Sequence, residues 1–252
     1  MPSDREAARW IRCFDPVPRA EVRLVCFPHA GGVAGFYRPL STALSPSFEV
    51  LAVQYPGRQD RFGEPFPDDL DELSDRLAGV LRQAGEVVFL GHSMGAIVAF
   101  EVARRLDRPP TELFVSGTGA PGRQESARMR DGDALAAMGR LGGTDAAILQ
   151  DRELRELILP ILQGDLRLMD AYRYSPGAPL ACPITALTGD ADPLTTVDDA
   201  RLWSRHTSGR FRLRIFRGGH FYLTDQWNAV AAAVAGSPPV SRRIPTTHDS
   251  GR

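Results

Sequence analysis

The stretch EVVFLGHSMGAIVAFEVARRL, residues 86–106, decides the fold of this chain. It begins with EVVFL, a short apolar run that predicts a buried strand. It ends with AIVAFEVARRL, which predicts a helix. Between the two, residues 91–95 read Gly-His-Ser-Met-Gly. The chain must therefore pass from strand to helix through a tight turn that carries Ser93.

The residue types in this turn suit a reactive serine. Gly91 and Gly95 leave out the Cβ atoms where the strand and the helix crowd together. Ser93 then projects above the sheet at the N-terminus of the helix, where the helix dipole favours developing negative charge. A strand, a serine turn and a helix in this order predict the nucleophile elbow of an α/β-hydrolase.

Short apolar runs alternate with helix candidates along the rest of the chain. The predicted strands are 22–27, 48–53, 86–90, 112–117 and 183–189, with 211–216 suited to a strand near the sheet edge and 11–14 to a short antiparallel edge strand. The predicted helices lie near 36–45, 68–84, 93–106 and 196–206. This alternation predicts a mostly parallel sheet covered by helices on both faces, as the α/β-hydrolase fold requires.

The region from about 120 to 180 departs from this rhythm, because it carries helical patterns without a strong strand. Five of its apolar residues have the spacing of one helix face: Leu154, Leu157, Ile158, Ile161 and Leu162. Pro160 is expected to kink or split this helix. Inserted between two strands, the region predicts a helical lid over the carboxyl edge of the sheet. An ordinary helical subdomain without a substrate role is the alternative.

The remaining organisation is simple. Residues 237–252 are Pro-rich, polar and without periodicity, so we expect them to be disordered. One domain then spans residues 1–236. The three cysteines, Cys13, Cys26 and Cys182, give neither a disulfide framework nor metal-ligand spacing. We expect Cys26 and Cys182 to be buried as small hydrophobic residues.

Charge and hydropathy exclude several classes of function. The formal net charge is -1 over 252 residues, which gives no support for nucleic-acid binding through a strongly basic surface. No apolar stretch approaches the length of a membrane span, and the N-terminus lacks the apolar core of a signal peptide. The sequence therefore predicts a cytoplasmic protein that binds no membrane.

A serine hydroxyl needs a neighbouring base, and the chain offers five histidines. His248 lies in the tail, His206 ends a helix candidate and is expected at the surface, and His92 is expected to point away from the substrate. His29 belongs to a different loop. His220 follows the last strand, at the carboxyl edge where the base must stand. We therefore expect His220 to be the general base.

The acid that orients this base should lie after a strand, between the serine and the histidine in chain order. The segment after PITALTG supplies two carboxylates, Asp190 and Asp192. In the usual G-x-x-D arrangement the second takes the role. We expect Asp192 to fix the imidazole tautomer and stabilise the imidazolium, and Asp190 to cap the turn. Asp190 is the alternative acid.

The oxyanion of an acyl-transfer reaction needs two backbone N–H donors. One is expected from Met94, directly after the serine. The other is expected from Ala30, because FPHAGG (27–32) follows an early strand and its paired glycines allow a sharp turn. A turn that is merely flexible is the alternative at this position.

Five motifs together are similar to those of the type II thioesterases that act with modular polyketide synthases and nonribosomal peptide synthetases. They are FPHAGG (27–32), YPGRQDR (55–61), GHSMG (91–95), GDADP (189–193) and GGHFYL (218–223). The resemblance runs from about Arg9 to Gly236, and the combination is more specific than any one motif. It implies the triad Ser93, Asp192 and His220 and the donors Ala30 and Met94.

The resemblance also implies a reaction. The family hydrolyses acyl thioesters from the phosphopantetheine arm of carrier proteins, so the implied partner is an acyl or peptidyl carrier protein. No metal or organic cofactor is required, and a monomer is expected. A carboxylesterase or lipase and an acyltransferase of the same fold are the catalytic alternatives. A non-catalytic binding module is the third, against which the complete triad argues.

The arginines of YPGRQDR allow two interpretations. Arg58 and Arg61 either form ion pairs that brace the loop near the site entrance, or meet phosphate or the acidic surface of a carrier protein. We favour bracing.

Overall fold

Seven strands form one sheet in the part of the chain that this computed structural model describes, residues 4–82, 84–122, 139, 141 and 151–236. The sheet order is β1-β3-β2-β4-β5-β6-β7. The strands are β1 Ile11–Cys13, β2 Val22–Phe27, β3 Phe48–Val53, β4 Val87–His92, β5 Glu112–Ser116, β6 Ile184–Gly189 and β7 Phe211–Phe216. All neighbours pair in parallel except β1, which runs antiparallel to β3. This is the predicted α/β-hydrolase sheet, including both predicted edge strands.

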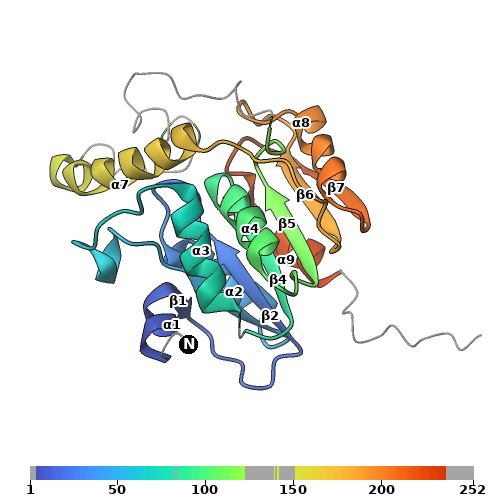
Figure 1. Cartoon of the computed structure of the whole chain (residues 1–252), viewed down its shortest axis with the longest axis horizontal. Coiled ribbons are helices and arrows are strands. Elements are labelled where there is room, and N and C mark those ends of the chain that lie inside the picture. Colours follow the sequence, from blue (N-terminus) through green and yellow to red (C-terminus); the bar gives the residue numbers. More distant parts are fainter. Residues whose placement is uncertain (1–3, 83, 123–138, 140, 142–150, 237–252) are drawn as a thin grey trace, which may run out of the picture.

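Helices cover both faces of this sheet. They are α1 Asp4–Trp10, α2 Arg38–Leu44, α3 Leu70–Leu81, α4 Met94–Arg105, α7 Arg152–Ala171, α8 Val197–Arg201 and α9 Trp227–Ala235. Alternate strand residues point to opposite faces, so Val25 and Phe27 of β2 belong to the hydrophobic cluster that contains α3 and α4. Leu24 and Cys26 belong to the cluster that contains α2 and α9. In Figure 1, α3 and α4 lie in front of the sheet and α9 lies behind it.

The predicted helices are present, and two further helices were missed. Short 3₁₀ segments flank two of the predicted ones, Ala34–Tyr37 before α2 and Leu202–His206 after α8. The sequence analysis did not identify α1 or α9. Their sequences, DREAARW and WNAVAAAVA, are short. In α9 the alanines hide the apolar stripe, because alanine occurs on both buried and exposed helix faces.

The described part of the predicted insertion is dominated by α7. Pro160 lies inside this helix, which continues through it, so the expected split is absent and the expected kink stays a prediction. A proline removes one N–H from the helical ladder, and the turns after it are held by burial of Ile161, Leu162 and Leu168. Most of residues 120–150 and all of 237–252 fall outside the described residues, so the lid and the disordered tail remain predictions.

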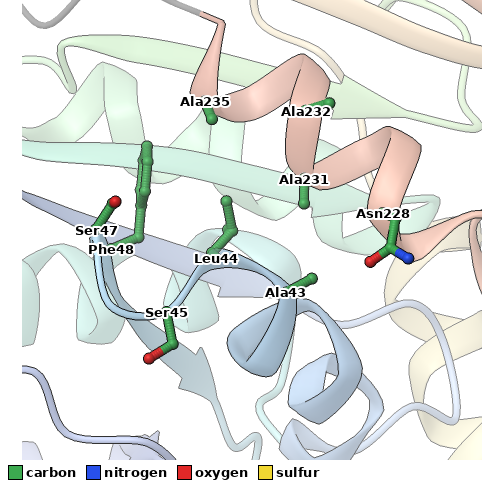
Figure 2. Close-up of a pocket in the computed structure, with 9 residues that line it drawn as sticks. All are labelled: Ala43, Leu44, Ser45, Ser47, Phe48, Asn228, Ala231, Ala232 and Ala235. Atoms are coloured by element: carbon green, nitrogen blue, oxygen red, sulfur yellow. The ribbon is translucent and has the colours of Figure 1, made fainter.

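A pocket of about 300 Å³ lies between the end of α2, the start of β3 and α9 (Figure 2). Its wall contains alanines, serines and Asn228, together with Leu44 and Phe48. Phe48 is the first residue of β3, so the pocket opens at the amino end of that strand. The nucleophile elbow follows the carboxyl end of β4, and this pocket therefore does not belong to it.

Direct backbone contact fixes α4 against the end of β2. A Cβ atom on Gly95 would lie 2.0 Å from the carbonyl oxygen of Phe27 and 2.5 Å from that of Pro28. A Cβ atom on Gly91 would lie 2.2 Å from the carbonyl oxygen of Gly95. Real Cβ atoms essentially never approach so closely, and here the obstacles are backbone atoms that cannot rotate away. Both elbow positions therefore require glycine.

We predict that Gly95→Ala destabilises the fold by about 3 kcal/mol or more, because the added methyl group forces α4 away from β2. Gly79→Ala in α3 is the matched control, since its Cβ would meet nothing within 4 Å. That change should be neutral or stabilising by up to about 1 kcal/mol, because it replaces glycine in a helix. Urea unfolding of the two variants measures both effects, and equal stability of the two would refute the packing argument.

Candidate active site

Ser93 occupies a strained turn between β4 and α4. Its φ of 54° and ψ of −121° lie in a region that non-glycine residues rarely adopt. The Ser93 N–H donates to the carbonyl of Ser116 at the end of β5, at 2.7 Å, which helps to hold this conformation. His92 and Met94 on either side are buried, whereas Ser93 is partly exposed. The turn thus presents one hydroxyl at the carboxyl edge of the sheet, as strained turns at functional sites do.

The loops after β6 and β7 are joined backbone to backbone. The N–H of Asp190 donates to Phe216 at 2.8 Å, and the N–H of Ala191 donates to Gly218 at 2.9 Å. Gly189 allows this approach, because a Cβ there would lie 2.3 Å from the carbonyl oxygen of Gly218. The acidic loop and the histidine loop are consequently one rigid unit.

His220 and Asp192 meet within this unit. The Nδ1 of His220 lies 2.9 Å from Oδ2 of Asp192, and the side chains are 3% and 0% exposed. An ionised carboxylate only accepts hydrogen bonds, so Nδ1–H donates and the lone pair of Nε2 is left free to act as a base. Oδ1 of Asp192 accepts the N–H of Leu194 at 2.9 Å, which fixes the carboxylate.

The second carboxylate of this loop has another partner. Oδ1 of Asp190 accepts the N–H of Gly218 at 2.8 Å, so Asp190 fastens the two loops together instead of contacting the imidazole of His220. The geometry therefore favours Asp192 as the orienting acid.

Two further histidines lie beside His220 and are buried. The ring of His92 is centred 5.0 Å from that of His220 and 6.0 Å from that of His29. His92 Nδ1 lies 2.9 Å from Oγ of Ser116, which in turn lies 2.7 Å from the hydroxyl of Tyr222. The side chain of His92 was expected to point away from the substrate. It lies in the protein interior, beside the ring of His220.

Burial keeps these two inner histidines neutral. It lowers the pKa of His29 to about 3, and electrostatic interactions with His220 and with Arg58 act in the same direction. Burial likewise lowers the pKa of His92 far below its ordinary value, with His220 and His29 as further causes. Neither inner imidazole is therefore positively charged at neutral pH.

The loop expected to supply the second oxyanion donor lies against the start of α4. The contact of Gly95 with Phe27 and Pro28 brings this loop to the helix N-terminus, where the N–H of Met94 has no partner within the helix. Tyrosine hydroxyls hold the loop from behind: Tyr37 donates to Phe27 at 2.9 Å and Tyr55 donates to Pro28 at 3.2 Å. Ala30 follows directly in the chain and is 8% exposed.

Arg58 and Arg61 are both buried, and each forms an ion pair. Arg58 is 1% exposed and forms a two-point ion pair with Asp165 of α7, at 2.6 and 2.7 Å. Arg61 pairs with Glu64 at 2.7 Å, and its guanidinium stacks over the Trp10 ring at 4.1 Å. These contacts are those expected of bracing residues.

Sequence reasoning missed Asp165 and misplaced His206. Asp165 continues the apolar face of α7, three positions after Leu162, and a lone carboxylate on such a face signals a buried cation elsewhere. His206, expected at the surface, is half-buried, and its ring lies 5.3 Å from that of Phe100 and 5.6 Å from that of Trp203.

The described residues give few other candidate sites. Cys26 and Cys182 are free and buried, as predicted, and burial raises the pKa of both thiols. Among the described residues, no group of three His, Cys, Asp or Glu side chains is placed to hold a metal ion. No helix in that same part of the chain has the length and apolar character needed to cross a membrane.

Comparison with known proteins places this geometry in context. Residues 22–237 match the model of the thioesterase domain family. A protein of Streptomyces griseus named "Probable cadicidin biosynthesis thioesterase" is 47% identical over 251 residues, which cover 96% of this chain and 70% of that protein. Thioesterase PikA5 of Streptomyces venezuelae is 43% identical, covering 97% of this chain and 90% of the relative.

A solved structure shares both the fold and much of the sequence. The type II thioesterase BorB from the borrelidin biosynthetic cluster superposes with a TM-score of 0.80. It is 45% identical in sequence, and the match covers 90% of this chain and 96% of that one.

We predict that buried His29 makes the fold sensitive to acid. The unfolded chain protonates this histidine below about pH 6.5, whereas the folded protein does so only near pH 3. Between these values the unfolded state binds one more proton. The free energy of unfolding should therefore fall by about 1.4 kcal/mol per pH unit as the pH is lowered, from this group alone. Urea unfolding at several pH values should show a shallower dependence in His29→Gln, and identical slopes would contradict the assignment.

We also predict that the two loop aspartates differ sharply in importance. Asp192→Asn should lower kcat by about 10⁴-fold, because an amide can donate to Nδ1 and favour the wrong imidazole tautomer. Asp190→Asn is the matched control and should keep most of the activity, since its partner is the Gly218 N–H. Hydrolysis of a chromogenic ester measures both variants. If Asp190→Asn is inactive while Asp192→Asn is near wild type, the acid is Asp190.

Proposed function

This chain belongs to the thioesterase family, and from that premise we propose that it is a type II thioesterase of polyketide or nonribosomal peptide biosynthesis. Its substrates would be acyl groups held as thioesters on the phosphopantetheine arm of a carrier protein in the cytoplasm. The observation that carries the proposal is the buried His220–Asp192 pair standing against the elbow that bears Ser93.

The proposed reaction uses two displacement steps. Oγ of Ser93 attacks the thioester carbonyl while Nε2 of His220 takes its proton, and the N–H groups of Ala30 and Met94 hold the oxyanion. The carbon–sulfur bond then breaks, and the pantetheine thiolate leaves with the proton from His220. A water molecule next attacks the Ser93 ester, again losing its proton to His220. The free acid leaves, and the serine regains its proton.

The environment of His220 supports this cycle. Its Nδ1–H donates to Asp192, so the imidazolium that forms in each step is stabilised without the carboxylate taking up the proton. Burial lowers the pKa of the neighbouring His92 and His29, so both are weak bases and neither competes with His220 for the serine proton. The strained turn at Ser93 fixes the hydroxyl in advance, which saves conformational entropy during the reaction.

Two named relatives support the carrier-bound substrate class. The names of the Streptomyces griseus and borrelidin-cluster proteins associate them with biosynthetic pathways. A thioesterase that resembles them over nearly its full length is expected to meet acyl groups in the same chemical form. The acyl carrier or peptidyl carrier protein is accordingly the proposed partner.

We predict that the purified chain hydrolyses acyl groups loaded on carrier proteins with a higher kcat/KM than matched oxygen esters. Ser93→Ala and His220→Ala should each lower kcat by roughly four to six orders of magnitude with the fold retained, because triad members act as a unit. Mass spectrometry should detect a fluorophosphonate adduct on the wild type and none on Ser93→Ala.

The controls separate the alternatives. Faster turnover of the oxygen ester would indicate a carboxylesterase, and acyl transfer to an added alcohol or amine in preference to water would indicate an acyltransferase. A wild-type protein that forms no adduct and hydrolyses neither substrate would overturn the proposal.

A further inference from the structure

Asp165 of α7 is a fully buried carboxylate with three donors, and one of them belongs to the oxyanion loop. The side chain is 1% exposed. Its Oδ2 accepts the backbone N–H of Gly31 at 2.7 Å and Nη1 of Arg58 at 2.7 Å. Its Oδ1 accepts Nη2 of Arg58 at 2.6 Å. One side chain therefore joins α7, the Pro-Gly-Arg loop and the loop that carries Ala30.

Arg58 holds the same loop at a second peptide group, the one after Gly32. Besides pairing with Asp165, its Nη1 donates to the carbonyl of Gly32 at 3.0 Å, and its Nε donates to Pro56 at 3.2 Å. The Gly31 N–H and the Gly32 carbonyl are thus held at once, by opposite charges. Because the pair is neutral overall, it fixes the loop without placing net negative charge beside a developing oxyanion.

The held segment is a turn with two possible backbone orientations. The N–H of Gly32 donates to the carbonyl of His29 at 2.9 Å, and Gly31 has a φ of 74°, which together describe a type II turn with Ala30 and Gly31 at its centre. In a type I turn the peptide between these two residues is flipped. A flip would turn the Ala30 carbonyl toward the carboxylate of Asp165. A carboxylate can only accept hydrogen bonds, so the two oxygens would repel each other.

We propose that Asp165 is a positioning residue for the oxyanion hole. It holds the Gly31 N–H and so fixes the whole turn from His29 to Gly32 in place, which keeps the Ala30 N–H, on the preceding peptide, directed at the reacting carbonyl oxygen. The inference rests on the proposed function, in which Ser93 is the nucleophile and Ala30 is an oxyanion donor. It makes α7 part of the catalytic apparatus, although Asp165 itself touches no reacting atom.

Close packing holds Asp165 at the required distance. A Cβ on Gly164 would lie 2.9 Å from the ring of Phe66, and a Cβ on Gly57 would lie 2.7 Å from the same ring. Phe66 is thus wedged between α7 and the loop of Arg58. Leu162, one turn earlier in the helix, packs on Gly31, whose Cβ would lie 3.4 Å from its Cδ1. The helix cannot move relative to the loop without opening these contacts.

The deciding experiment removes the ion pair without leaving a buried charge. In the double variant Asp165→Leu/Arg58→Met, both charges are replaced by apolar side chains of similar size, which often leaves stability unchanged. We expect kcat for a chromogenic ester to fall about 10- to 100-fold with KM unchanged. That loss is smaller than the 10²–10³-fold cost of deleting an oxyanion donor, because the donor is only misaligned.

Two ligands separate positioning from general loosening of the site. An alkylboronic acid forms a tetrahedral adduct with Ser93 and places an oxygen in the oxyanion hole. An alkyl thioether, in which a CH₂ group replaces the thioester carbonyl, binds only as a substrate mimic. The double variant should lose affinity for the boronic acid in parallel with kcat and keep its affinity for the thioether. Equal losses for both ligands would refute the inference.

Tyr172→Phe is the matched control on the same helix. The Tyr172 hydroxyl donates to the buried carboxylate of Glu101 at 2.7 Å, so this change also removes a buried hydrogen bond that anchors α7. It does not involve the oxyanion loop. We expect a lower melting temperature with kcat unchanged. A fall in kcat comparable to that of the double variant would show that Asp165 only anchors the helix and does not position the oxyanion loop.

The outcomes also separate this inference from the proposed function. If wild-type Ser93 forms no fluorophosphonate adduct, the proposed function fails. If the wild type is active and the folded double variant keeps wild-type kcat, only the role of Asp165 fails. Should the double variant not fold, Asp165→Glu provides the test, because it keeps the charge and displaces the carboxylate from Gly31. Wild-type kcat in Asp165→Glu would then overturn the inference.

Discussion

The structure depends on one close contact between the backbone of α4 and the backbone at the end of β2, with no side chain between them. At the elbow, α4 begins so close to the end of β2 that a single methyl group on Gly95 would overlap the carbonyl oxygens of Phe27 and Pro28. This contact brings the N-terminus of α4 to the loop that carries Ala30. The proposed nucleophile and both expected oxyanion donors are therefore arranged by main-chain geometry.

A second backbone contact positions His220, the proposed base, in the same way. Gly189 lets the loops after β6 and β7 join, and their hydrogen bonds carry Asp192 and His220 to each other across 28 residues of sequence. Around this pair the protein buries two further imidazoles, those of His29 and His92, and burial lowers the pKa of both. Histidines that are chemically identical thus acquire different roles from their surroundings.

The helix α7, which is the described part of the insertion, also contacts the loop that carries Ala30. Through Asp165, α7 reaches the Gly31 N–H and the guanidinium of Arg58, which lies 107 residues earlier in the chain. A buried ion pair adds little to stability by itself, and its value here would lie in fixing one orientation of a loop. The insertion and the oxyanion loop are then a single mechanical unit.

The sequence determined the features that depend on local order. Alternating apolar runs gave the parallel sheet, Gly91 and Gly95 marked the elbow, and the positions of Asp192 and His220 after two strands put them at one edge. Each follows from residue types a few positions apart, and such patterns are visible in one dimension.

Only the tertiary structure decided which distant groups meet. The partner of Arg58 could not be read from its neighbours, because Asp165 belongs to another element and the pairing depends on how α7 packs on the core. The separate partners of Asp190 and Asp192 and the burial of His206 were likewise undetermined until the loops were placed. Short-range patterns specify the elements, whereas the contacts between elements depend on the summed packing of the whole core.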